Sequence, residues 1–214
     1  MLFYISPIAP PQYTRQKSKF IMSRNHGLYA ALFAVALLVQ ALPNAADAAP
    51  PVPNGNITAL RAAIANAAPG GTIVLFKNGT YTLDGTQLVI TKQITIKGHG
   101  ATIDGNDQSG VIKIKSTGNL TLRNVIITGG AGHKGGGIDN AGTLTLSGNS
   151  SVSGNEADDG GGILNTGTVT MSDTSRVSSN NADVGGGILN GGTLINCIAG
   201  SNVVNNTVSD IFNE

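Results

Sequence analysis

Three copies of one glycine-rich segment, spaced 25 residues apart, constrain the fold of this chain more than any other feature. The copies begin at Gly135, Gly160 and Gly185, and they read GGGIDNAGTLTL, GGGILNTGTVTM and GGGILNGGTLIN. Self-similarity at a fixed period of roughly 20 to 50 residues is the signature of a repeat architecture. Each copy is therefore expected to form one turn of a solenoid that stacks on the next turn.

The composition of each turn narrows the choice of solenoid. Two or three short segments rich in β-branched residues are separated by glycine or asparagine, and no helical pattern lies between them. A leucine-rich repeat has a similar period, but it needs leucines at its own spacing and a helical side. The pattern predicts an all-β parallel β-helix with 25-residue coils, in which successive coils lie about 4.8 Å apart.

In-register stacking of the copies predicts which residues meet. Aliphatic residues are expected to fill the tube in one column: Ile138, Ile163 and Ile188. Asparagines are expected to link their amides from coil to coil, as in cross-β stacks: Asn140, Asn165 and Asn190. The three glycines are expected at a bend where neighbouring backbones approach so closely that a side chain would clash with its copy one coil away. In the last copy, Val203 and Asn206 align only if one residue has been inserted.

The segment before the repeats is expected to close one end of the tube. Residues 56–68 have Ile57, Leu60 and Ile64 at helical spacing, with Asn56 or Thr58 as the N-cap and Pro-Gly-Gly after the end. This predicts a short amphipathic helix that covers the terminal coil, because an open solenoid end exposes core and unpaired strand edges. Short β segments follow it in quick succession, beginning at residues 72, 80, 88, 94, 101, 111, 120 and 125.

The first 48 residues are predicted to be an N-terminal extension and a secretory signal peptide. The apolar run Leu28–Leu42 follows Arg24 and precedes a small-residue exit at 46–48, which is the pattern of a cleaved signal. The run is shorter than the roughly 20 residues of a membrane span. The signal is assigned to residues 22–48, so the mature chain is expected to be secreted or in the cell envelope, without a membrane span. Residues 49–55 form a proline-rich spacer, and residues 56–214 the β-helix domain.

Charge is divided unevenly along the chain. From residue 61 to 134 there are eight Lys/Arg against three Asp, whereas from residue 135 onward one Arg stands against eight acids. Such an asymmetry favours end-to-end orientation or attraction to a charged surface, although solvated faces of different composition would give it too. The chain has no lysine-arginine cluster that indicates nucleic acid. Its lone cysteine, Cys197, excludes a disulfide framework and is interpreted as a small core residue.

The motifs LRAAIANA, PGGTIVLFKNGTYTL, ITIKGHGATIDG, LTLRNVIITGG and the GGGI-x-N repeats resemble those of bacterial right-handed parallel β-helix repeat proteins. These are relatives of the polymorphic outer-membrane proteins and of exported proteins with a CSLREA-type motif. The resemblance covers residues 56 to about 206 and implies a pectate-lyase-like right-handed β-helix, exported and associated with the cell surface. The chain departs from the family pattern because the cysteine and glutamate of CSLREA and the Phe-x-x-Asn signature are absent. Members are typically longer, so the chain is also read as a truncated remnant of a larger surface protein.

The same fold hosts polysaccharide lyases and hydrolases, so candidate catalytic residues are weighed individually. Gly98-His99-Gly100 and the pair Asp158-Asp159 resemble polygalacturonase motifs, but their order in the chain is reversed. Arg123 is the candidate base of a lyase, with Arg176 as a second. The alternative is that His99 is an exposed corner residue and that the aspartates lie in a solvated loop. A hard cation would need oxygen ligands, and the candidates lie in equivalent loops: Glu156, Asp158, Asp159 and Asp183.

Two classes of function remain open at this point. The first is a non-catalytic, adhesin-like or structural scaffold that requires no cofactor and binds surface glycans or cell-envelope proteins. The second is a polysaccharide lyase or hydrolase with a degenerate site. Aromatic side chains stack on sugar rings, and after the signal the chain has only three aromatic residues: Phe76, Tyr81 and Phe212. This scarcity favours the scaffold.

Overall fold

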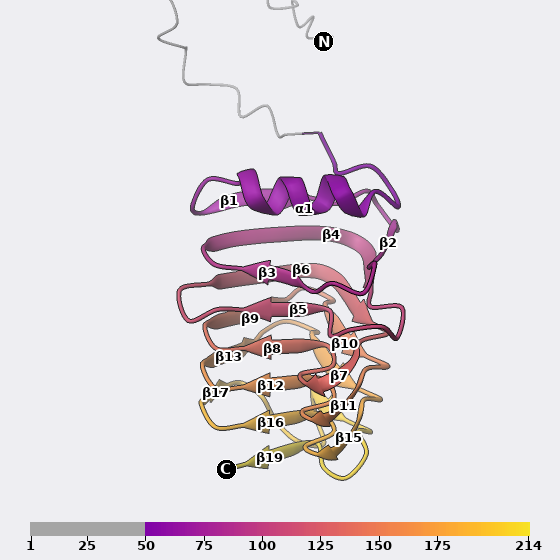
Figure 1. The fold of residues 1–214 in the computed structure, drawn as a ribbon. Coiled ribbons are helices and arrows are strands. Elements are labelled where there is room, and N and C mark those ends of the chain that lie inside the picture. Colours follow the sequence, from indigo (N-terminus) through magenta and orange to yellow (C-terminus); the bar gives the residue numbers. More distant parts are fainter. Residues whose placement is uncertain (1–49) are drawn as a thin grey trace, which may run out of the picture. The chain divides into compact units, whose positions relative to one another are not determined.

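We describe residues 50–214 of a computed structural model of the chain. They form a right-handed parallel β-helix of about six turns, with one short α-helix at its N-terminal side (Figure 1). The predicted fold class and the predicted helix are therefore confirmed. The predicted extension and signal peptide, residues 1–48, lie outside the described residues.

Helix α1 (Ile57–Asn66) lies over the first coil and covers that end of the rod (Figure 1). The side chain of Asn56 caps the helix by accepting a hydrogen bond at 2.8 Å from the backbone N–H three residues further on, which satisfies a donor that the first turn leaves free. Leu60 and Ile64 are buried against the core. The helix ends before residue 68, because Ala67 already has an extended backbone.

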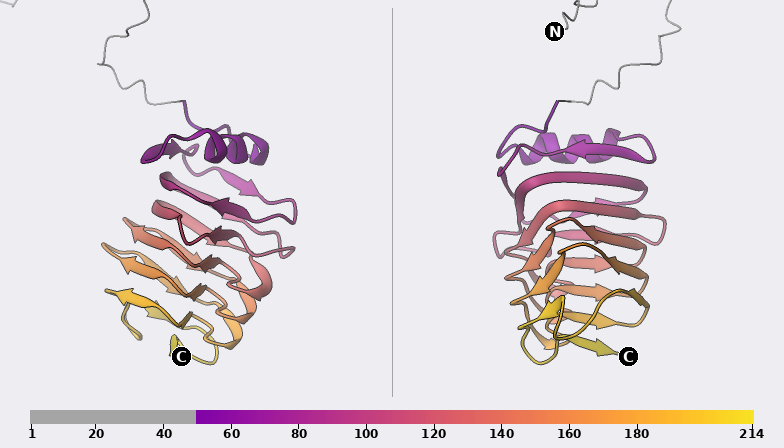
Figure 2. Two further views of the ribbon diagram at one scale, coloured as in Figure 1. Left: turned by 60° about the vertical axis from the view of Figure 1, so that its left-hand side comes forward. Right: turned by 180° about the vertical axis from the view of Figure 1, so that it is seen from behind.

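The strands of successive coils form three parallel sheets, which run along the rod (Figures 1 and 2). The ten-stranded sheet contains β1 (Gly71–Val74), β2 (Thr80–Thr82), β4 (Gln93–Asp104), β6 (Asn119–Thr128), β9 (Thr143–Ser147), β10 (Ser151–Ser153), β13 (Thr168–Met171), β14 (Arg176–Ser178), β17 (Thr193–Ile195) and β18 (Val203–Val204). The six-stranded sheet contains β3 (Leu88–Ile90), β5 (Ile112–Ile114), β8 (Ile138–Asn140), β12 (Ile163–Asn165), β16 (Ile188–Asn190) and β19 (Ile211–Asn213). The three-stranded sheet contains β7 (Ala131–Lys134), β11 (Glu156–Asp159) and β15 (Asn181–Val184).

The core is a column of stacked aliphatic side chains, as the repeat alignment predicted. The pairing registers place one such residue from each strand of the six-stranded sheet directly over the next: Leu88, Ile112, Ile138, Ile163, Ile188 and Ile211. The first five of these are almost fully buried. Burial of a large aliphatic side chain contributes roughly 1.5–3 kcal/mol, so this column is a main source of the stability of the rod.

Two ladders of asparagine amides run inside the same tube. In the predicted ladder, Nδ2 of Asn140 donates to Oδ1 of Asn165 at 2.7 Å, and Asn165 donates to Asn190 at 2.8 Å. A second ladder joins Asn155 to Asn180 at 2.9 Å, and Asn180 to a further asparagine at 3.0 Å. Because buried amides are costly without partners, each ladder fixes the register between coils as well as stabilising them.

The triple glycines are required by close backbone approach. A Cβ on Gly162 would lie 2.6 Å from the carbonyl oxygen of Gly187, its own copy one coil away. A Cβ on Gly161 would lie 2.2 Å from the carbonyl oxygen of Asn181. The first glycine of the last two copies, Gly160 and Gly185, also has a positive φ of 66° and 64°, which favours glycine. The predicted clash between copies is confirmed.

Three local features differ from the sequence pattern or refine it. Two pairs of predicted short strands merge, so β4 and β6 are long strands that bend around a corner (Figure 2). Val52, which lies in the predicted spacer, is buried and pairs with Leu75 in an isolated parallel bridge. The predicted insertion in the last repeat is confirmed, because Val177 pairs with Val203 at a separation of 26 residues (203 − 177).

Candidate functional site

Because the coils stack in the order of the chain, the uneven charge of the sequence becomes a difference between the two ends of the rod. The coils near α1 carry eight Lys/Arg against three Asp, and the coils from residue 135 onward carry one Arg against eight acids. In Figure 1 this division follows the colours from indigo and magenta to orange and yellow. The N-terminal coils are therefore suited to bind an anion, and the C-terminal coils to bind a cation.

Four basic side chains gather at one corner of the first three coils. We call this set the basic corner: Lys77, Lys97, His99 and Arg123. Lys97 on β4 and Arg123 on β6 are direct partners in the pairing of these two strands. Lys77 lies in the coil above, next to a backbone hydrogen bond from Asn78 N to the His99 carbonyl oxygen. All four side chains are exposed.

His99 projects from the corner because β4 carries two extra residues there. The register of β4 on β6 shifts between Lys97 and Ala101, where four steps along β4 match two steps along β6 (101 − 97 = 4; 125 − 123 = 2). The segment Gly98-His99-Gly100 bulges around Asn124, and His99 has a φ of 50°. The structure therefore places His99 at an exposed corner, which is where the non-catalytic alternative put it.

Two shallow hollows meet at His99 and Asn124. One has a volume of about 370 Å³ and is lined by Lys97, His99, Arg123 and Asn124. The other has a volume of about 280 Å³, and Lys77 and Asn149 contribute to its lining. Amide side chains thus line the hollows together with the cations, so the corner offers both positive charge and hydrogen-bond donors to a ligand.

Among residues 50–214, no carboxylate forms an ion pair with the cations of the basic corner. The three ion pairs among residues 50–214 all lie elsewhere. Like charges directly opposite each other on neighbouring strands are destabilising, and this is the relation between Lys97 and Arg123. The first acid further along this corner is Asp173, which already accepts a hydrogen bond from Gly148 N at 2.7 Å. An anion bound between the two cations would relieve this repulsion.

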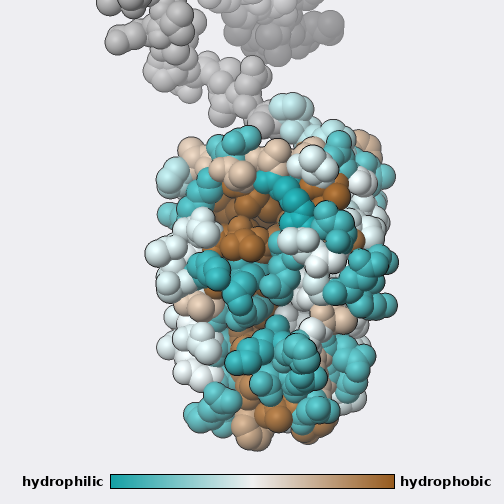
Figure 3. Space-filling view, viewed as in Figure 1, coloured by the Kyte–Doolittle hydropathy of each residue, from teal (hydrophilic) through white to brown (hydrophobic). Residues whose placement is uncertain are grey.

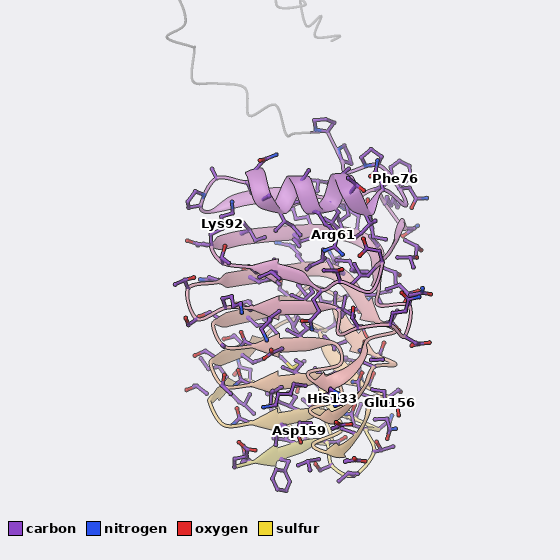
Figure 4. All side chains as sticks on the ribbon, viewed as in Figure 1. Arg61, Phe76, Lys92, His133, Glu156 and Asp159 are labelled. Carbon is purple, nitrogen blue, oxygen red and sulfur yellow. The ribbon has the colours of Figure 1, made fainter. Side chains whose placement is uncertain are left out.

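One exposed aromatic residue is the sequence neighbour of a lysine of the basic corner. Phe76 is 51% exposed and immediately precedes Lys77 in the chain (Figure 4). The other two aromatic residues of the part of the chain that the structure describes cannot assist it, because Tyr81 is fully buried and Phe212 lies on β19 at the opposite end of the rod. An aromatic ring beside cations and amides is suited to a sugar ring that carries an anionic group.

The acidic candidates lie on a different sheet from His99 and Arg123. Glu156, Asp158 and Asp159 are on β11 of the three-stranded sheet, and Asp183 occupies the position one coil beyond Asp158 on β15. Because successive side chains of a strand point to opposite sides, Asp158 and Asp159 do not converge. Within the described part of the chain, no group of three or more His, Cys, Asp or Glu is arranged to hold a metal ion. Arg176 is exposed on β14, again on another strand.

The partner of Asp158 is a histidine that sequence reasoning missed. His133 Nδ1 lies 2.5 Å from Asp158 Oδ2 on the flank of the rod, near Glu156 and Asp159 (Figure 4). The hydrogen bond and the negative charge of Asp158 raise the pKa of His133 above its usual value. The two residues are 25 positions apart (158 − 133), so extension of the period to the segment before Gly135 would have found the pair.

A polar cleft of about 580 Å³ lies next to this pair, between β5, β7 and β8. Its lining includes His133, Lys134 and Lys113, and Lys113 forms an ion pair with Asp139 one coil away. Two of its three basic groups are therefore already paired with a carboxylate. The cleft is accordingly a weaker anion site than the basic corner.

Cys197 does not fit a nucleophilic role. It is half-buried and packs against the hydrophobic core. Burial raises the pKa of its thiol to about 11, so the reactive thiolate is scarce at neutral pH.

The architecture defines the chain as a parallel β-helix protein with an exposed basic corner. Comparison with known protein families, with curated proteins and with solved structures found no match. Among residues 50–214, no helix has the length and apolar character to cross a membrane.

Proposed function

We propose that this protein is an exported, cell-surface-associated β-helix scaffold that binds an acidic polysaccharide at its basic corner without cleaving it. One observation carries the proposal: Lys97 and Arg123 are stacked on neighbouring strands with no acidic partner in the described protein. A carboxylate or sulfate group between them would supply the missing counter-charge. Its sugar ring would lie beside Phe76, and its hydroxyl groups beside the amides of Asn124 and Asn149.

A polymer suits this corner better than a single small anion. The four basic groups belong to three successive coils, which lie about 4.8 Å apart, so they form a line along the rod. Repeated charges on a polysaccharide can contact several of them at once, which raises overall avidity without new kinds of contact. The hollows are shallow and open, as expected for a chain that lies along a surface.

The proposal also states that the protein does not cleave the polysaccharide that it binds. A hydrolase places two carboxylates on either side of the scissile bond, but the acids of β11 lie on another sheet from the basic corner. A polysaccharide lyase or hydrolase with a degenerate site remains the competing function. The observation that favours this competing function is the His133–Asp158 pair. In residues 50–214, this is the one pair in which an exposed histidine contacts a carboxylate.

Binding can be measured by calorimetry or by affinity electrophoresis with polygalacturonate, using neutral dextran as the control polymer. Each contact between unit charges near 4 Å in water contributes about 1 kcal/mol. The double variant Lys97→Ala/Arg123→Ala is therefore expected to bind about 30-fold more weakly. The matched control Lys115→Ala/Lys134→Ala removes the same charge from other parts of the rod and should bind as the wild type does.

Three results would contradict the proposal. Equal loss in the control pair would indicate non-specific attraction or binding in the polar cleft. Unchanged binding in the Lys97/Arg123 variant would exclude the basic corner. Release of unsaturated or reducing sugars from polygalacturonate or alginate, with calcium present, would assign the enzymatic function instead. Export is tested separately by N-terminal sequencing of the mature protein, which is expected to begin after residue 48.

A further inference from the structure

A hydrophobic groove opens between α1 and β3, and none of the residues that line it belongs to the basic corner. Figure 3 shows it as a brown hollow near the upper end of the front face. The groove has a volume of about 430 Å³, which is within the usual range of about 300–1,000 Å³ for ligand sites. Its apolar lining comes from α1, β3 and β4: Ile64, Leu88, Val89, Ile90 and Ile94.

The groove exists because the first coil contributes no strand to the six-stranded sheet. Every later coil does so, and β3 is therefore the terminal strand, with β5 on one side and the groove on the other. In place of a neighbouring strand, the chain has helix α1 (Figure 1). The side chains of Leu88 and Ile90, which begin two core columns, thus form part of the groove lining.

The edge of β3 that faces the groove carries an unused peptide group. Leu88 N donates to Val111 O, and Ile90 O accepts from Lys115 N, both at 2.9 Å, so the groups of Leu88 and Ile90 point toward β5. In a parallel ladder the intervening residue points its N–H and C=O to the other side. Val89 therefore presents a donor and an acceptor to the groove, and its own side chain is 45% exposed.

Both ends of the groove are basic. At one end, Arg61 donates to Gln87 O at 3.0 Å and pairs with Asp84 at 2.7 Å. At the other end, Lys92 Nζ donates to Ala65 O at 2.7 Å but has no acidic partner in residues 50–214 (Figure 4). The two cations and one acid leave a net positive rim around an apolar floor.

We propose that this groove binds an extended peptide strand that pairs with β3, with aliphatic side chains at alternate positions and an acidic residue at each end. Strand addition to a free sheet edge gives affinity through main-chain hydrogen bonds, and specificity through pockets for alternate side chains. The inward side chains of the peptide would continue the columns that begin at Leu88 and Ile90. One acidic end would meet Lys92, which has no acidic partner in residues 50–214, and the other would share Arg61 with Asp84.

A second copy of the chain is a poorer occupant. The free edge of its six-stranded sheet is β19, and the column register would place the polar Asn213 over Ile90. The two buried residues of the free strand β3, Leu88 and Ile90, are both aliphatic, so aliphatic residues at both inward positions match this edge better. The proposal is independent of polysaccharide binding, since it uses no residue of the basic corner.

The probe is an acetylated, amidated hexapeptide, Glu-Ile-Thr-Ile-Thr-Asp, titrated into the full-length chain by calorimetry. The control peptide, Glu-Ile-Ile-Thr-Thr-Asp, has the same composition and charge but lacks the alternation. Saturable binding is expected for the first peptide, with the control about tenfold weaker or more. Hydrogen exchange should show that the Val89 amide becomes protected only with the alternating peptide.

Two variants locate the site without touching buried residues. Ala65→Trp places an indole in the groove from an exposed helix position, and it is expected to abolish binding. Ala62→Trp adds the same ring to another exposed position of α1 outside the groove lining, and it should bind normally. The proposal is overturned if neither peptide binds, if both bind equally, or if the two variants behave alike. It is also overturned if sedimentation shows a dimer of the wild type that Ala65→Trp dissociates, since the occupant would then be a second copy.

Discussion

The asparagine ladder allows a stability prediction whose magnitude follows from its contacts. Asn165 is fully buried, accepts a hydrogen bond from Asn140 at 2.7 Å, and donates to Asn190 at 2.8 Å and to the Thr193 carbonyl oxygen at 3.2 Å. Each such bond contributes about 1 kcal/mol net. Asn165→Ala should therefore lower the free energy of unfolding by about 3 kcal/mol, with a further cost for the cavity.

The end of the same ladder provides the control. Asn213 is exposed and forms a single ladder bond, accepting from Asn190 at 3.0 Å. Asn213→Ala is expected to cost less than about 1 kcal/mol. Urea unfolding followed by far-ultraviolet circular dichroism measures both variants against the wild type. If Asn165→Ala costs no more than Asn213→Ala, the amides do not hold neighbouring coils together and the reasoning fails.

Three further predictions concern a bend and two titratable groups. Gly161→Ala should destabilise the rod by several kcal/mol, because the new Cβ would lie 2.2 Å from the Asn181 carbonyl oxygen; a thermal midpoint equal to that of the wild type would refute this. In a proton NMR titration, His133 should show a pKa above 6.5 that Asp158→Asn returns to the usual value. The raised pKa means that the small stabilisation from this exposed pair is present below about pH 6.5 and is lost as pH rises through the folded pKa. Cys197 should react slowly with iodoacetamide at pH 8, since its pKa is raised to about 11, and urea should restore ordinary reactivity; fast alkylation of the folded protein would contradict its burial.

The repeat period made most of the architecture predictable. Residues 25 positions apart in the repeats lie directly over each other, because the coils stack in register. The repeat alone therefore places Ile138 over Ile163, aligns the asparagines and explains the glycines. The capping helix was predictable from its apolar spacing and its N-cap asparagine. These features depend only on local pattern and on the repeat.

The basic corner could not be derived in the same way. Its cations lie before the regular repeats, where the spacing of stacked residues changes from 26 to 24 across the bulge at His99 (123 − 97 = 26; 125 − 101 = 24). Lys97 and Arg123 therefore do not align under a 25-residue period. The groove at β3 was hidden for another reason: a missing strand leaves no signal in the sequence, and only the topology shows that the six-stranded sheet begins one coil late.

In-register stacking underlies every proposal made above, and methyl NOE spectroscopy tests it most directly. With isoleucine δ1 methyl groups labelled, cross-peaks should connect Ile112 to Ile138, Ile138 to Ile163, and Ile163 to Ile188, because strands in adjacent coils lie about 4.8 Å apart. Residues two coils apart, such as Ile138 and Ile188, should give much weaker cross-peaks or none. Absence of the cross-peak between Ile138 and Ile163, or an equally strong one between Ile138 and Ile188, would contradict the β-helix.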